Sequence, residues 1–285
     1  MRTVGIIGGS GLYDMDGIQG LKEVKVATPF GKPSDAYRCG TLAGVNVVFL
    51  SRHGQGHRIS PSAINYRANI FGMKKLGVSA IVSVSACGSL KEEIKPMDFV
   101  IPDQFVDRTF GRETSFFKDG IVAHVGFADP VCPKIADILY RSAQALNVGV
   151  HRGGTYLNME GPQFSTKAES RLYRSWNLDI IGMTNATEAK LAREAEIAYA
   201  TLAAITDYDC WHPTHDSVTI DVILGYLNKN VANAKKILKD AIPQVAKVDS
   251  FTAEHALKCA IVTSREHIPS KIKKDLKIII GKYLK

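Results

Sequence analysis

The sequence predicts a single α/β domain in which helices flank a twisted central sheet of mixed strand direction. Short apolar segments alternate with segments of helical period along most of the chain, which is typical of this class. No change of composition, internal repeat or low-complexity linker divides the 285 residues. We therefore expect one domain over residues 1–285, with a largely helical C-terminal part from about residue 216.

Short runs of apolar and β-branched residues predict the strands, in the order 3–8, 45–50, 80–85, 99–101, 153–159, 179–182 and 197–206. Between them, apolar residues at helical spacing predict helices over 62–76, 134–146, 167–176 and 188–195. After residue 209 we expect helical segments near 218–248, 251–262 and 270–284. In folds of this kind, ligands bind beyond the carboxyl ends of the strands.

The net charge of +8 is concentrated at the end of the chain, where residues 271–285 hold six lysines and one aspartate. Apolar residues recur at helical spacing through that stretch, so the lysines form the solvated face of an amphipathic helix, and a nucleic-acid partner is not expected. No apolar run is long enough to span a membrane, and no secretory signal precedes the first strand, which favours the cytoplasm. The five scattered cysteines form no C-x-x-C pair and predict no metal site.

Two carboxylates, Asp207 and Asp209, end the strongly apolar strand 197–206. If both face a half-buried pocket, each raises the pKa of the other, and the protonated one becomes a hydrogen-bond donor and a general acid. Alternatively, one acid faces solvent and the other caps the next helix. The spacing alone leaves both interpretations open.

Small polar groups follow other strands. The turn 8–12 is rich in glycine and carries Ser10, which suits either an anion or a structural hairpin, and it lacks the glycine spacing of a dinucleotide site and the Walker lysine. Arg52 and His53 follow the second strand, and the planar guanidinium suits phosphate. Ser85 and the Ala86 amide offer further donors after the third strand.

Cys87, beside Ser85, is a conceivable nucleophile, but no base is marked for it and no G-x-S-x-G elbow is present. Met183 and Thr184 follow another strand. Together the strand ends predict a pocket for two substrates. An anion binds at one end, donor and acceptor carboxyls lie at the other, and no cluster of metal ligands is present nearby.

These residues resemble the trimeric purine nucleoside phosphorylase family, and within it the members that act on 5′-methylthioadenosine. The resemblance covers residues 5–227 and is carried by residues 8–12, 28–35, 52–54, 61–62, 65–69, 86–90, 103–105, 107–109, 160–165 and 206–211. It implies a phosphorylase/hydrolase-like α/β fold. The implied reaction cleaves the N-glycosidic bond of S-methyl-5′-thioadenosine with inorganic phosphate as co-substrate, and it needs no cofactor. The products are adenine and S-methyl-5-thio-α-D-ribose 1-phosphate.

Position by position, the resemblance assigns phosphate binding to Ser10, Arg52, His53, Ser85, Ala86 and Thr184. It assigns contacts with the nucleoside to Phe164, Met183, Asp207, Tyr208 and Asp209, the two aspartates being catalytic. Ser10 and Ser85 stand where family members often carry threonine, and the hydroxyl is kept.

Substrate choice follows from the same resemblance. Protonated Asp207 donates to N7 and ionised Asp209 accepts from the 6-amino group, so adenine is favoured over a 6-oxopurine by about 3 kcal/mol. An apolar 5′ pocket is implied for Ile220, Ile223 and Leu224, with Ser165 also affecting specificity. His124 aligns with a residue that reaches a neighbouring subunit's site, which implies a homotrimer or a dimer of trimers.

Other functions remain open from the residues. A nucleosidase would use water in place of phosphate. A broad or 6-oxopurine phosphorylase would cleave adenosine, inosine or methylthioinosine, and a non-catalytic sensor would bind a nucleoside without turnover. Rates with and without phosphate separate these activities.

Overall fold

A mixed β-sheet organises the computed structural model, which describes residues 1–12, 15–213 and 220–284. Within those ranges the sheet has 11 strands, and its main path runs β2-β3-β4-β1-β5-β10-β9-β7. β11 pairs with both β5 and β6, and β6 also pairs with β8. The strands are β1 (Thr3–Gly8), β2 (Ile18–Val24), β3 (Tyr37–Leu42), β4 (Val45–Ser51), β5 (Val78–Ser89), β6 (Phe99–Ile101), β7 (Gln104–Arg108), β8 (Val150–Arg152), β9 (Thr155–Met159), β10 (Ile180–Gly182) and β11 (Ala198–Asp207).

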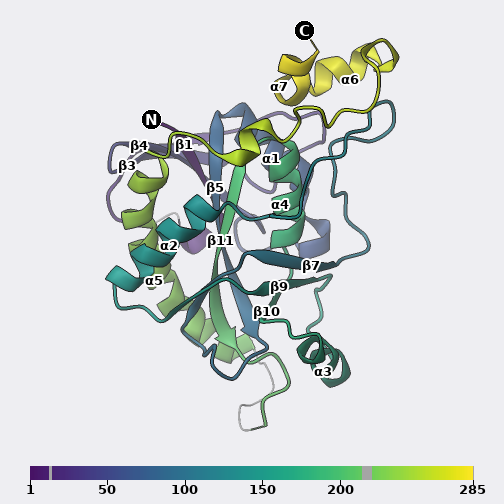
Figure 1. The fold of residues 1–285 in the computed structure, drawn as a ribbon. Helices are drawn as coiled ribbons and strands as arrows, with labels where there is room; N and C mark the ends of the chain where they lie inside the picture. Colours follow the sequence, from purple (N-terminus) through teal and green to yellow (C-terminus); the bar gives the residue numbers. More distant parts are fainter. Residues whose placement is uncertain (13–14, 214–219, 285) are drawn as a thin grey trace.

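Helices cover both faces of the sheet, with α2 and α5 on one side and α1 and α4 on the other (Figure 1). The alternation of side chains along β1 produces the two cores: Val4 and Ile6 pack with α2 and α5, whereas Ile7 packs with α1 and α4. The helices are α1 (Tyr66–Lys75), α2 (Pro133–Ala145), α3 (Lys167–Ser175), α4 (Asn185–Glu194), α5 (Ile220–Val245), α6 (Ser270–Asp275) and α7 (Lys277–Ile280).

The predicted fold class is confirmed, and the differences concern individual elements. β2, β3, β7 and β8 were not predicted, and β5 is longer than the expected strand 80–85. Residues 62–76 begin as a short 3₁₀ turn, Pro61–Ala63, before α1. The helix expected over 251–262 is wrong, because that segment contains one 3₁₀ helix, Thr252–His255, followed by turns. The terminal helix is divided into α6 and α7 at Leu276.

Candidate active site

Strand β5 connects the two ends of the candidate site. At one end, Arg52 follows β4 and donates from Nη1 to the carbonyl of Val84, at 3.1 Å. At the other, Asp207 at the end of β11 lies opposite Gly88 in the parallel ladder. Val84 and Gly88 are four positions apart on one strand, which corresponds to about 13 Å at 3.3 Å per residue. The predicted guanidinium and carboxyl groups are thus both held beside β5.

Arg52 is a buried cation, with 3% of its side chain exposed. Its Nε donates to Oε1 of Glu188, and its Nη2 donates to Oε2 of Glu188 at 3.1 Å and to the Ser83 hydroxyl at 2.5 Å. Burial alone lowers the pKa of the guanidinium, but the Glu188 carboxylate outweighs burial and holds that pKa above its usual value. The arginine is therefore permanently charged and fixed in orientation.

The start of α4 brings Thr184 and Asn185 beside this pair. Thr184 is the N-cap of α4 and is buried, and its hydroxyl donates to Oδ1 of Asn185 at 3.0 Å. Nδ2 of Asn185 donates to the hydroxyls of Thr201, at 2.6 Å, and Ser83, at 3.3 Å. A hydroxyl proton can rotate, so Thr184 is able to donate to an anion instead of to Asn185.

His53 and the residues of β5 complete the predicted anion end. Nδ1 of His53 lies 2.8 Å from the Ile59 carbonyl. Burial, reinforced by the charge of Arg52, lowers the pKa of His53 to about 4, so this ring is neutral near pH 7. The Ser85 hydroxyl lies 3.4 Å from the sulfur of Cys87, and Ala86 is exposed. Burial raises the pKa of the Cys87 thiol to about 11, which argues against Cys87 as a nucleophile.

Asp207 and Asp209 form the carboxyl end. The Thr206 hydroxyl donates to Oδ2 of Asp207 at 2.6 Å, and the amide of Asp209 donates to Oδ1 of Asp207 at 2.8 Å. Burial, with a smaller contribution from the Asp209 charge, raises the pKa of Asp207, although these hydrogen bonds oppose the shift. Burial also raises the pKa of Asp209, against hydrogen bonding from Cys210.

Tyr208 lies between these two acids in the sequence, but its side chain contacts other residues. Its hydroxyl lies 3.3 Å from the Glu92 carbonyl, and its ring packs on Trp211 and stacks on His212. Asp209 itself adopts a left-handed backbone conformation, with φ of 50°. The Tyr208 side chain thus packs within the loop after β11.

Arg112 joins Met183, which is predicted to contact the nucleoside, to the loop that carries Phe164, and no pattern in the sequence predicts this role. Its guanidinium, with 1% of the side chain exposed, donates to the Met183 carbonyl and, at 2.6 Å, to the Glu160 carbonyl. It also pairs with the Glu160 carboxylate at 3.2 Å and contacts the Tyr66 hydroxyl at 3.2 Å. Arg112 therefore joins the start of α1, the loop after β9 and the loop after β10.

The loop after β9 approaches Met183 closely. A Cβ on Gly161 would lie 2.5 Å from the Met183 sulfur, and φ at Gly161 is +72°, so glycine is required there. Further along this loop Phe164 is 49% exposed, whereas Ser165 is buried, with its hydroxyl 3.8 Å from the sulfur of Met159.

Of the remaining predicted residues, one is exposed at the surface and the others have side chains outside the described part of the chain. His124 is exposed, and its amide donates to the Ala260 carbonyl at 2.9 Å. The side chains of Ser10, Ile220, Ile223 and Leu224 lie outside the described residues, although Ser10 begins a 3₁₀ helix and Ile220 begins α5. Among the described residues no group of three His, Cys, Asp or Glu side chains could hold a metal ion.

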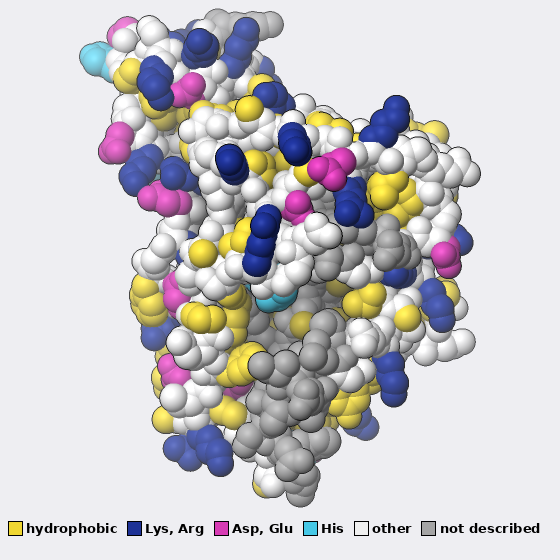
Figure 2. All heavy atoms as spheres, turned by 180° about the vertical axis from the view of Figure 1, so that it is seen from behind, with side chains coloured by type: hydrophobic (Ala, Val, Ile, Leu, Met, Phe, Trp, Pro, Cys, Tyr) yellow, Lys and Arg dark blue, Asp and Glu magenta, His cyan; other side chains and the backbone are white. Residues whose placement is uncertain are grey.

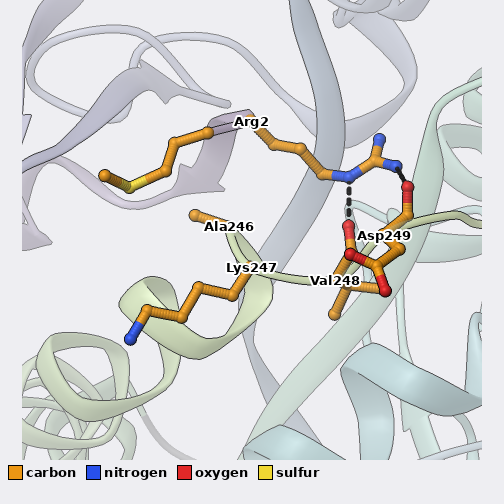
Figure 3. Close-up of a pocket in the computed structure, with 6 residues that line it drawn as sticks. Arg2, Ala246, Lys247, Val248 and Asp249 are labelled. Atoms are coloured by element: carbon orange, nitrogen blue, oxygen red, sulfur yellow. Dashed lines mark hydrogen bonds between the residues drawn. The ribbon is translucent and has the colours of Figure 1, made fainter.

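Two surface grooves do not coincide with these residues. One is lined by Met1, Arg2 and residues 246–249, and there Arg2 donates to the carbonyls of Val248 and Asp249 (Figure 3). The other crosses β2, which is an edge strand, and its neighbours β3 and β4. In the first, Arg2 is occupied by contacts within the chain, so we interpret that groove as structural and the surface along β5 as the candidate site.

The charged surface gives no indication of a single basic stripe. In Figure 2, lysine and arginine side chains are dispersed among acidic and apolar ones on the face shown. In the described part of the chain, no helix combines the length and apolar character needed to cross a bilayer.

The fold, with an anchored arginine and two acids at the carboxyl ends of its strands, defines an α/β enzyme. The phosphorylase superfamily model matches residues 3–243, and the chain belongs to this family.

Relatives with known names are similar over nearly the whole chain. The S-methyl-5′-thioadenosine phosphorylase of Koribacter versatilis is 57% identical over 280 residues, covering 98% of this chain and 96% of that protein. A methylthioadenosine phosphorylase from an antarctic soil metagenomic library has a structure that superposes with a TM-score of 0.94 at 51% identity, covering 98% of both chains. The methylthioadenosine phosphorylase of Schistosoma mansoni in complex with tubercidin superposes with a TM-score of 0.83 at 37% identity, covering 90% of this chain and 96% of that one.

Proposed function

We propose that this chain catalyses the phosphorolysis of S-methyl-5′-thioadenosine, giving adenine and S-methyl-5-thio-α-D-ribose 1-phosphate. The observation that carries the proposal is the near full-length similarity to S-methyl-5′-thioadenosine phosphorylases, at 57% identity, combined with a buried arginine that donates to β5 and two acids at the end of the neighbouring strand β11. Inorganic phosphate is a substrate, and no cofactor takes part.

The reaction breaks the bond between C1′ and N9 and forms a bond between C1′ and a phosphate oxygen. Positive charge develops on the sugar and the bonding electron pair moves to the purine, so an anion beneath C1′ and a proton delivered to N7 both lower the barrier. Phosphate at Ser10, Arg52, His53, Ser85, Ala86 and Thr184 supplies the anion. Protonated Asp207 supplies the proton, becomes ionised, and recovers a proton from solvent after adenine leaves.

The raised pKa of Asp207 supports this role, because a general acid must hold its proton at the working pH. An ionised Asp209 accepts from the 6-amino group of adenine, which a 6-oxopurine lacks. Met183 contacts the ribose and Phe164 the base. Tyr208 contributes through its backbone, since its ring packs away from the acids against Trp211 and His212.

We infer that the active form is a homotrimer, alone or paired into a dimer of trimers. The side chains of Val122 and Val262 are 47% and 66% exposed and lie beside each other, because the Val262 amide donates to the Val122 carbonyl. His124 follows on the same segment, and an apolar exposed patch of this kind favours burial against a second copy. Sedimentation at a mass of about three times 31.1 kDa, or twice that, is expected.

We infer a cytoplasmic location. All five cysteines, each within the described residues, carry free thiols, which suits a reducing compartment.

The deciding experiment measures kcat/KM for methylthioadenosine, adenosine and inosine, each with and without phosphate. We expect adenine release only with phosphate, and methylthioadenosine as the preferred substrate. Equal release in phosphate-free buffer would identify a hydrolase, and faster cleavage of inosine would identify a 6-oxopurine phosphorylase.

A further inference from the structure

Glu188 on α4 is buried beside Arg52 at the anion end of the site, and the proposed mechanism gives it no role. Its side chain is 2% exposed. Both carboxylate oxygens accept hydrogen bonds from Arg52, one from Nε and one from Nη2. Such a two-point contact fixes the plane of the guanidinium as well as its distance.

The carboxylate is itself held by two hydroxyls. Ser83 on β5 donates to Oε2 at 2.9 Å, and Tyr199 on β11 donates to the same oxygen at 2.9 Å. The hydroxyls therefore orient the carboxylate from the sheet, and the carboxylate orients the arginine. Two buried charges of opposite sign stabilise each other, so removing either one leaves the other buried without a partner.

This arrangement restricts what Arg52 can offer to a ligand. A guanidinium has five N–H groups, and Glu188, Ser83 and the Val84 carbonyl take one on Nε, two on Nη2 and one on Nη1. Within the described part of the chain, one N–H on Nη1 is left for an anion. A single directed donor depends on its orientation much more than a freely rotating ammonium group does.

We propose that Glu188 is a positioning residue for phosphate, which acts through Arg52 by fixing the direction of that remaining N–H. The proposal rests on the proposed phosphorolysis. Glu188 does not touch phosphate in this scheme, and Ser83 and Tyr199 extend the positioning to the sheet.

The test is Glu188→Gln, with phosphate saturation measured at a fixed, saturating methylthioadenosine concentration. Whichever oxygen becomes the amide nitrogen, a donor then faces the donors of Arg52, so the two-point contact is lost. We expect the phosphate KM to rise at least about tenfold, which corresponds to about 1.4 kcal/mol, with the nucleoside KM changed less than about twofold. A phosphate KM equal to or below that of the unmodified protein overturns the proposal.

A double-mutant cycle with Arg52→Ala tests whether Glu188 acts through the arginine. Once Arg52 is absent, Glu188→Gln should raise the phosphate KM by less than about twofold further. A full additional tenfold increase contradicts positioning through Arg52.

Glu194→Gln is the matched control. Glu194 lies on the same helix and is buried, but its carboxylate accepts from Ser115 and the Phe116 amide, away from Arg52. This variant should leave the phosphate KM unchanged, and an increase equal to that of Glu188→Gln would identify a general effect of disturbing α4. If Glu188→Gln does not fold, Tyr199→Phe removes one hydrogen bond to the same carboxylate and should raise the phosphate KM about threefold, whereas an unchanged KM overturns the proposal.

These outcomes separate the inference from the function on which it rests. Phosphate-independent adenine release by the unmodified protein refutes phosphorolysis. If the unmodified protein requires phosphate but Glu188→Gln has an unchanged phosphate KM, only the positioning role of Glu188 is refuted.

Discussion

The two ends of the site differ in whether a buried ionisable group has a partner of opposite charge. At the anion end, Arg52 is matched by Glu188, so the cation remains ionised although both side chains are almost fully buried. At the carboxyl end, Asp207 and Asp209 accept hydrogen bonds from hydroxyls and amides, and within the described part of the chain neither forms an ion pair. Burial therefore raises the pKa of both acids.

The difference shows how one sheet supports a fixed charge and a transferable proton, whose contacts with β5 lie four residues, about 13 Å, apart along that strand. A counter-ion keeps a buried group charged, whereas the absence of one allows a carboxyl to stay neutral. Electrostatic binding at one end and proton donation at the other thus require different surroundings.

Replacing the proton donor should give the largest effect. In Asp207→Asn the acid proton is lost, and we expect kcat/KM for methylthioadenosine to fall about a hundredfold or more, the range of general acid catalysis. Inosine should be affected less, because it does not use the same donor and acceptor pattern. Steady-state rates on both nucleosides check this, and equal losses would remove the assigned role of Asp207.

Removing the fixed charge should give the next largest effect, and a different one. Arg52→Ala should raise the phosphate KM about thirtyfold, because a charge-assisted hydrogen bond is lost, while the nucleoside KM changes little. Part of the loss will be structural, since Glu188 is left buried without a partner. Saturation curves for each substrate in turn distinguish the two ends, and an unchanged phosphate KM would exclude Arg52 from that site.

The pH profile sharpens the comparison. A donor with a raised pKa is protonated below that pKa, so kcat/KM should decline on the alkaline side as Asp207 ionises. Asp207→Asn should lack this decline, whereas Arg52→Ala should retain it. Profiles measured at saturating phosphate check both variants, and an unaltered decline in Asp207→Asn would assign it to another group.

The variant with the smallest effect on activity concerns stability at a third acid, the buried Glu194. Burial raises its pKa to about 7 from 4.5, against hydrogen bonds from Phe116 and Ser115. The folded protein therefore keeps a proton that the unfolded chain loses, and the free energy of unfolding falls as pH rises from about 4.5 to 7, by up to about 3 kcal/mol. Because Glu194→Gln removes this loss, its Tm relative to the unmodified protein should increase between about pH 5 and pH 8.

The apolar strands were predictable because runs of apolar side chains must be buried in the core. β1 and β6 match the predicted ranges, and β11 ends at the predicted acids. The end of β5 was interpreted as a loop, since Ala86, Cys87 and Gly88 are small, yet it continues because β10 and β11 both pair with it. β2 was missed because most of its residues are exposed, so no apolar alternation marks it.

Helix prediction was weaker at the C-terminal end. Residues 251–262 contain apolar positions that pack against the core, but short turns place Phe251, Ala253 and Leu257 there without a continuous helix. Periodicity alone does not distinguish these arrangements.

For the site, sequence reasoning predicted groups at the strand ends but not the residues that hold them. Glu188 and Arg112 act over 136 and 71 positions of sequence, to Arg52 and Met183 respectively. No local pattern indicates such partners, because only the tertiary fold brings them together.

One consequence follows from the attachment of both ends to β5. Movement of α2, whose described residues make no hydrogen bond to either side chain, leaves the spacing between Arg52 and Asp207 unchanged, whereas movement of α4 would shift Glu188 and with it the guanidinium. A rigid inhibitor that joins an anion to an adenine ring at that spacing should therefore lose little conformational entropy on binding, whereas a flexible linker of equal length should bind more weakly.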